Sequence, residues 1–234
     1  MIIFNGAALE DIAPVMIEDI RVSPIELNVT AAQRPIRWGA DFVRVTGGTR
    51  TVTITFAVIK NDLSVRQQYL KQITKWARSA TPGQLQLPGH DGVYIECVCT
   101  ELPEPSLRQW WEGKLRLVFT AFDNPYFTSI MEKTADCGND PFTVGGDAPP
   151  LMRITNTFAA TASDPAWSDG TDTVGFTSIG TGEFVMDLNR QTAALDGVSV
   201  MGAYKYLTSS FIIPHTGEMT ITGSGTVHFR ERWE

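Results

Sequence analysis

The side chains from which nucleophilic or metal chemistry is most often built are scarce in this chain and widely separated. Its three histidines are His90, His215 and His228, and no two of them have the spacing of a metal site. A serine or cysteine nucleophile needs a neighbouring base to activate it, and no credible base is found. We therefore expect no catalytic residues, no metal and no cofactor, in a protein that assembles or binds rather than one that turns over a substrate.

The three cysteines are expected to be reduced thiols. Cys97 and Cys99 lie two residues apart on one face of a predicted strand, where a thiol packs as a small hydrophobe. An odd number of cysteines at these spacings, Cys137 included, is typical neither of a disulfide framework nor of a zinc site. The pattern favours synthesis in a reducing cytosol.

An acidic stretch in the second half is the best candidate for a ligand loop. In ASDPAWSDGTDT, Trp167 lies close to Asp169 and Asp172, so carboxylate oxygens could hold calcium and the indole could stack on a sugar. Tyr204 and Tyr206 are a second place where a sugar could bind. The alternative is a plain loop, because the spacing fits no EF-hand and Asp-Gly is ordinary turn chemistry.

Composition and charge narrow the class of protein. Hydrophobic residues make up 43% of the chain and charged residues 19%, which is enough for packed cores. Acidic and basic side chains balance over residues 1–135, so the whole net charge of −7 falls in residues 136–234. Nucleic-acid recognition needs a basic surface, which this distribution disfavours. No apolar stretch approaches the ~18 residues of a membrane helix, and the first residues lack the pattern of a signal peptide.

One helix among strands is the pattern of the first half. Residues 50–59, RTVTITFAVI, alternate in a way that predicts a strand with one face on a core. Residues 61–80 repeat apolar side chains at three- and four-residue spacing, which predicts a helix laid over a sheet and capped by Asn61 or Asp62. Further strands are expected at 84–87, 93–100 and 114–122.

The second half is predicted to be β throughout, and the chain as a whole to be mainly β. The expected organisation is a β-sheet or sandwich domain with one helix over 1–135, a Gly-, Pro- and Asp-rich linker over 136–149, and a β-sandwich over 150–234. Its strands are predicted at 151–156, 173–179, 183–188, 198–201, 210–213, 219–222 and 226–233. The sequence leaves open which domain holds the last of them.

In order and spacing, these elements resemble the distal tail proteins (Dit family) of phages or prophages with long, flexible tails. In the first half the resemblance lies in the RTVTITFAVI strand, the helix DLSVRQQYLKQITKWARS, and the segments QLQLPG, VYIECVCT and AFDNPYF. In the second half it lies in GEFVMDLNRQTAALDG and FIIPHTGEMTITGSGTVHFRERW. The similarity therefore spans nearly the whole chain.

This resemblance implies a structural role in a virion, with the protein made in the cytoplasm of the bacterial host. Such proteins form a homohexameric ring at the tail tip, through a sheet-and-helix core and a hairpin arm laid on the neighbouring subunit. A galectin-like β-sandwich lies on the outside. The ring joins the tail tube protein to the tail-associated fibre or lysin, and in some members the outer domain carries receptor-binding proteins. Here that domain is short, which disfavours an inserted sugar-binding module.

The arm is expected between residues 33 and 50, and it supplies the predicted interface. Aromatic residues and arginines in a turn-rich segment are a combination enriched at protein interfaces. We expect Trp38, Phe42 and Val45 to contact the adjacent subunit, with Arg34, Arg37 and Arg44 at the rim. The alternative for Trp38 is packing in its own core. For the whole protein, the alternative function is a carbohydrate-binding module that recognises a receptor for a tail or a cell-surface assembly.

Overall fold

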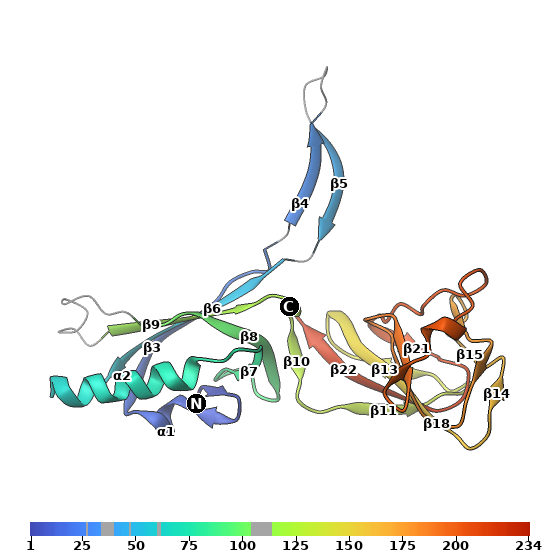
Figure 1. Cartoon of the computed structure of the whole chain (residues 1–234). Coiled ribbons are helices and arrows are strands. Elements are labelled where there is room, and N and C mark those ends of the chain that lie inside the picture. Colours follow the sequence, from blue (N-terminus) through green and yellow to red (C-terminus); the bar gives the residue numbers. More distant parts are fainter. Residues whose placement is uncertain (27, 34–39, 47, 60–61, 104–113) are drawn as a thin grey trace. The chain divides into compact units, whose positions relative to one another are not determined.

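The computed structural model describes residues 1–26, 28–33, 40–46, 48–59, 62–103 and 114–234 (Figure 1). The chain divides into two compact units, Met1–Phe127 together with Glu234, and Thr128–Trp233. Both are built mainly from antiparallel strands, which confirms the predicted fold class. Among the described residues, no helix is long and apolar enough to cross a membrane.

The first unit combines a β-sheet with helices. Its elements are β1 (Ile3–Phe4), β2 (Ala7–Ala8), α1 (Leu9–Ile12), β3 (Val15–Val22), β4 (Asn28–Gln33), β5 (Ala40–Thr46), β6 (Arg50–Val58), α2 (Leu63–Ala77), β7 (Gly83–Gln86), β8 (Val93–Glu101) and β9 (Lys114–Ala121). A further strand, β10 (Phe127–Ser129), spans the boundary between the units.

The strands of the first unit are antiparallel in the order β2-β1-β7-β8-β9-β6-β3. Strand β6 lies between β3 and β9, and its side chains alternate strictly between buried and half-buried. The buried set comprises Val52, Ile54, Phe56 and Val58, together with Arg50 at the start of the strand. The period-2 pattern of the sequence therefore predicted both the strand and its core face correctly.

Helix α2 lies along one face of this sheet (Figure 1). Asp62 caps it, because its Oδ1 accepts a hydrogen bond from the backbone N–H of Ser64 at 2.8 Å. Ile73 and Ala77 are fully buried, and the Trp76 indole donates to the carbonyl of Ala7 at 2.9 Å. The helix ends three residues before the predicted end, since Arg78 is already extended ahead of the turn into β7.

The hairpin of β4 and β5 stands apart in the pairing scheme of the first unit. The two strands pair with each other, from Asn28 opposite Thr46 to Gln33 opposite Ala40, and with no other described strand. A register shift lies between Thr30 and Ala31. The hairpin falls in the segment where the sequence predicted an arm.

The second unit is β with a single 3₁₀ turn among its described residues. Its elements are β11 (Lys133–Asp136), β12 (Phe142–Val144), β13 (Ala148–Phe158), β14 (Ala162–Ser163), β15 (Ala166–Ser168), β16 (Thr173–Gly175), β17 (Ser178–Ile179), β18 (Gly182–Asp187), β19 (Thr192–Leu195), β20 (Val198–Ser199), η1 (Met201–Ala203), β21 (Gly217–Met219) and β22 (Thr226–Trp233).

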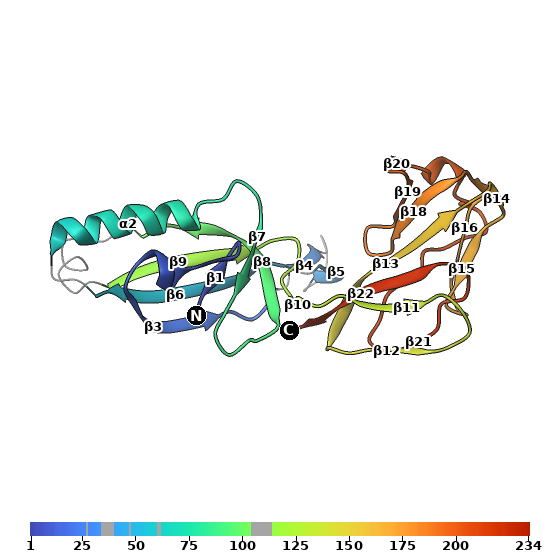
Figure 2. The same cartoon turned by 90° about the horizontal axis from the view of Figure 1, so that it is seen from below.

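One antiparallel sheet dominates the second unit, in the order β20-β19-β18-β13-β22-β11 (Figure 2). Three short pairs, β12–β21, β14–β17 and β15–β16, lie outside this sheet. The core includes Trp167 from β15, Phe184 from β18 and Phe229 from β22, so side chains of the short pairs pack against the large sheet.

The structure corrects several expectations in this half. The boundary between the units follows Phe127 rather than residue 135, and the segment 136–149 is not a free linker, because β12 pairs with β21 and β13 begins at Ala148. Residues 201–203 form a 3₁₀ turn and residues 210–213 form no strand. The last strand, β22, belongs to the second unit, where it pairs with β13 and β11.

Candidate functional site

The tryptophan of the predicted ligand loop is part of the core. Trp167 is 1% exposed, and its ring lies stacked on Phe184 with the centroids 5.1 Å apart. Its indole N–H donates to the carbonyl of Ser224 at 2.7 Å, so its one polar group is satisfied inside the protein. The ring therefore offers no free face on which a sugar could stack.

The carboxylates of the same loop hold the loop itself together. Oδ1 of Asp169 accepts from the backbone N–H groups of Thr171 and Asp172, at 2.8 and 2.7 Å. The Asp172 carboxylate accepts from the Ser210 hydroxyl at 2.5 Å. Within the described chain, no three His, Cys, Asp or Glu side chains are grouped so that they could hold a metal ion. This is turn chemistry, the alternative that the sequence left open.

The two tyrosines differ in their surroundings. Tyr204 is 9% exposed, packs against Phe176 and Phe211, and has a pKa raised by burial. Tyr206 is 68% exposed, and its hydroxyl donates to the carbonyl of Met201 at 3.3 Å. Of the aromatic residues considered for sugar binding, only Tyr206 presents its ring to solvent.

The histidines have structural partners and lie in different settings. His90 stacks on the ring of Phe127 with the centroids 4.5 Å apart. His228 lies on β22, with Nε2 2.9 Å from the Thr155 hydroxyl and Nδ1 3.4 Å from the Glu132 carboxylate. His215 contacts the carbonyl of its neighbour Thr216. Of the three histidines, only His228 has a hydroxyl at one ring nitrogen and a carboxylate near the other.

Burial also makes the thiols poor nucleophiles. All three cysteines are free, and burial raises the pKa of the Cys97 thiol far above its ordinary value. Burial raises the pKa of Cys99 and of Cys137 to about 11 each. Because the thiolate is the reactive form, these side chains are mainly protonated near neutral pH.

Charged side chains join the first strand of the second unit to its last. Glu231 of β22 is 8% exposed and accepts hydrogen bonds from Lys133 Nζ at 2.6 Å and from the Gly145 N–H at 2.8 Å. Glu132 likewise contacts Arg153 at 3.0 Å and Arg230 at 3.8 Å. These pairs stabilise strand packing, since each carboxylate meets cations from other strands.

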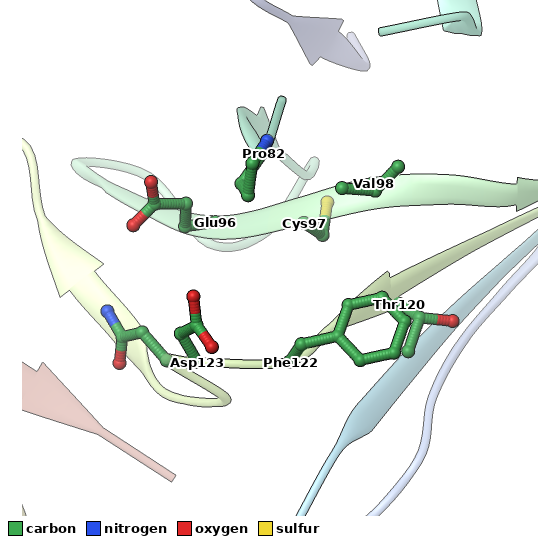
Figure 3. A pocket seen from close by; sticks show the side chains of 8 residues that line it. Pro82, Glu96, Cys97, Val98, Thr120, Phe122 and Asp123 are labelled. Carbon is green, nitrogen blue, oxygen red and sulfur yellow. The ribbon is translucent and has the colours of Figure 1, made fainter. Parts of the chain in front are cut away.

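A small acidic hollow lies in the first unit, at a place where the sequence indicated only the end of a strand. It opens between β8 and the segment that follows β9, is open to solvent, and has a volume of about 20 Å³, room for about one water molecule (Figure 3). Glu96, Cys97, Thr120, Phe122 and Asp123 are among the residues that line it. Within the described chain, neither carboxylate forms a hydrogen bond or an ion pair.

Strand pairing explains why the hollow exists. Strands β8 and β9 pair at Val98 opposite Thr120, but the pairing goes no further in the direction of Glu96. From there β8 pairs with β7, where Glu96 lies opposite Gln84, while β9 stays with β6 and ends at Ala121. The two strands diverge, and the hollow opens between them. Sequence alone could not place Glu96 beside Asp123, because this divergence is a property of the sheet.

The predicted interface residues fall in the arm. Arg34, Arg37 and Trp38 lie outside the described residues. For Phe42, Arg44 and Val45 the structure describes the backbone, which lies on β5 opposite Ala31, Thr30 and Val29, and their side chains lie outside the description. The interface assignment therefore stays a prediction.

Comparison with known structures identifies the fold. The whole chain superposes on the SPP1 Dit (gp 19.1) protein, which is described as a paradigm of the hub adsorption apparatus in phages that infect Gram-positive bacteria. The match covers 100% of this chain and 98% of that one, with a TM-score of 0.75 at 15% sequence identity. The chain has the distal tail protein fold.

Similarity to other solved structures is weaker. Two structures of the phage P2 baseplate in its activated conformation, with Ca and with Sr, match 94% of the chain. Both are 10% identical, and their TM-scores of 0.45 and 0.43 are too low to support an argument. No protein-family model and no curated protein matches the sequence. At 15% identity, the SPP1 similarity shows the distal tail protein fold.

Proposed function

We propose that this protein is a structural component of a phage virion, forming a hexameric ring at the distal end of the tail. The observation that carries the proposal is the end-to-end match to the SPP1 Dit protein, which includes both units and their order along the chain. A shared site or a single shared domain would be weaker support, because one fold serves many functions.

The hairpin of β4 and β5 supports assembly from identical copies. An isolated two-stranded hairpin is at best marginally stable in water, and its outer edges carry unpaired backbone groups. In the described chain these strands have no further strand partner. A neighbouring copy would supply one, with the arm of each subunit lying on a different surface of the next. Such a heterologous contact closes into a ring when the rotation between copies is right.

The proposed ring joins the tail tube protein on one side to a tail-associated fibre or lysin on the other. Receptor-binding proteins are candidate partners of the second unit. Catalysis has no part in this role, in keeping with thiols that are protonated near neutral pH. The protein would be made in the host cytoplasm and act at the tail tip.

Solution mass is the direct test. We expect light scattering after gel filtration to give a discrete hexamer, or a dimer of hexamers, over a range of concentrations. Replacing Trp38 and Phe42 together by Ala should abolish the ring and leave a folded monomer, as judged by circular dichroism. A ring that survives both changes would overturn the arm assignment, and a wild-type chain that is monomeric with and without tail tube protein would overturn the ring.

Exposed Tyr206 favours a second candidate function, recognition of a carbohydrate by the second unit. Solvent-exposed aromatic rings are the side chains on which sugars stack, and Tyr206 is the one exposed member of the tyrosine pair. The test is a glycan screen of the wild-type chain and of Tyr206→Ala. Glycan binding that is lost in the variant would support this function, and absence of binding by the wild-type chain would contradict it.

A further inference from the structure

The outward face of helix α2 carries cations that have no counter-charge. Lys71 and Lys75 lie one turn apart on the helix, Arg78 directly follows it, and all three are exposed. They lie on the side away from the buried Ile73 and Ala77, because residues three and four apart share one face of a helix. Within the described chain, none of the three cationic groups forms an ion pair or a side-chain hydrogen bond.

The rest of this face contains nothing that would balance the charge. Its other exposed residues are Ser64, Gln67 and Gln68, which are polar and neutral, and residues 63–90 contain no Asp or Glu. Like charges four residues apart destabilise a helix slightly, and a glutamate in place of Gln67 would offset the charge of Lys71. The face is therefore uniformly cationic at a small cost in helix stability, which favours a role in binding an acidic partner.

The residues of the face favour a protein partner over a membrane or a nucleic acid. A helix that binds at a membrane surface exposes apolar side chains beside its cations, whereas Ile73 and Ala77 of α2 are fully buried in their own unit. Proteins that hold single strands stack bases on exposed aromatic rings, and the exposed helix residues of this face are serine, glutamine and lysine. Three cations are also fewer than the roughly 6–10 phosphate contacts of a strong duplex binder.

The chain itself supplies a complementary surface. Its whole net charge of −7 falls in residues 136–234. Several cations of the second unit are already paired within it: Lys133 with Glu231, Arg153 with Glu132, and Lys205 with Asp164. Exposed carboxylates remain that form no ion pair in the described chain, namely Asp140, Glu183, Asp196 and Glu218. The second unit thus has unpaired carboxylates, and α2 has unpaired cations.

We propose that the basic face of α2 in one copy of this chain docks against the acidic second unit of another copy. The contact joins two different surfaces, as a closed ring of identical subunits requires. Complementary charge of this kind selects which surfaces meet and speeds their encounter. This inference rests on the proposed ring and names a contact within it.

Cross-linking with a carbodiimide tests the contact in the wild-type chain. The reagent activates a carboxyl group, and a lysine amine within reach attacks it to form an amide while the reagent leaves as a urea. Isotope-labelled and unlabelled chains are first assembled together, so that the mass of each linked peptide pair shows whether it joins two chains. We expect Lys71 or Lys75 to be linked to a carboxylate of residues 136–234 in a second chain. Links from these lysines only within one chain, only to residues 1–135, or not at all would overturn the contact.

Charge reversal on the helix is the second test. Lys71→Glu/Lys75→Glu should raise the dissociation constant of self-association at least roughly tenfold, because two attractive charge pairs become repulsive. Glutamate forms helices about as well as lysine, so circular dichroism should show an intact fold. Lys71→Gln/Lys75→Gln should give a smaller loss and a weaker dependence of association on salt.

A matched control separates this face from net charge. Arg21→Glu/Arg116→Glu makes the same change in net charge at two exposed positions on the sheet of the first unit. It should weaken association much less than the helix variant. Equal loss in the two variants would show that overall charge matters and the α2 face does not, which overturns the contact.

The outcomes also distinguish this contact from the ring. Rings that form equally well from the wild-type chain and from Lys71→Glu/Lys75→Glu overturn the contact and leave the ring in place. A wild-type chain that stays monomeric with and without tail tube protein overturns both. Binding of duplex DNA at physiological salt that is lost in the helix variant, without links between chains, would assign the face to a nucleic acid instead.

Discussion

Trp167 and Phe184 lie face to face in the second unit, with their ring planes 5° apart and their centroids 5.1 Å apart. One residue comes from the short strand β15 and the other from the large sheet, so their contact joins the two layers of the sandwich. Phe176 completes the cluster with edge-on contacts to both rings.

We predict that Trp167→Ala destabilises the second unit by about 3–5 kcal/mol, because it removes a fully buried aromatic side chain and leaves a cavity. Trp167→Phe should cost less, since it keeps a ring against Phe184 and loses only the hydrogen bond to Ser224 and part of the volume. Urea unfolding followed by near-ultraviolet circular dichroism measures both. A loss below about 1 kcal/mol for the alanine variant would contradict the core role.

Gly225 precedes the last strand and approaches another strand too closely for a side chain. Its φ is +111°, and a Cβ there would lie 2.2 Å from the carbonyl oxygen of Thr155. Gly225→Ala should therefore lower the free energy of unfolding of the second unit by about 1–3 kcal/mol, because it strains the backbone and displaces β13. Gly138→Ala is the matched control, because its Cβ would meet nothing within 4 Å and its φ is not in the left-handed region. Equal stability of the two variants in urea would contradict this reading.

Glu231 makes the stability of the second unit depend on pH in the acid range. Burial alone raises the pKa of this carboxyl, but hydrogen bonds from Lys133 and Gly145 outweigh it and hold the pKa below the ordinary 4.5. Because the folded pKa lies below the unfolded one, the ionised carboxylate contributes stability above about pH 4.5. That contribution is lost as the pH falls through the folded value.

Glu231→Gln should therefore lower the free energy of unfolding near neutral pH by about 1–2 kcal/mol. The difference between the variant and the wild type should shrink as the pH falls below 4.5. Urea unfolding of both proteins across the acid range measures it. Glu218→Gln, at an exposed position, is the control. A gap that stays constant with pH would show that the Glu231 charge is not what stabilises this contact.

The half-buried thiols should react slowly near neutral pH. Because burial raises the pKa of Cys99 and Cys137 to about 11, alkylation by iodoacetamide should be much slower than that of free cysteine and should speed up as the pH rises. Mass spectrometry of peptides after timed alkylation gives the rate at each residue. Alkylation of the folded protein at the rate of free cysteine would contradict these pKa directions.

Local patterns in the sequence were sufficient to predict several of the helices and strands. The strict alternation of 50–59 predicted β6 and its buried face, because successive residues of a strand point to opposite sides. Asp62 could be named as a helix cap, because capping is a contact between residues two positions apart. The order of the elements also led to the distal tail protein resemblance, which the fold now confirms.

Other features depended on which strands become neighbours, and only the tertiary structure decided these. The sequence predicted Trp167 as a ligand residue beside Asp169. The sandwich buries it instead, because Phe184 and Ser224, which are distant in sequence, lie against it. The segment 136–149 was predicted to be a linker because its composition is typical of turns. It contains β12, which pairs with β21. The hollow between Glu96 and Asp123 exists because β8 leaves β9 for β7. Composition and spacing describe a residue's near neighbours in the chain, whereas burial, pairing and cavities arise from segments that meet only on folding.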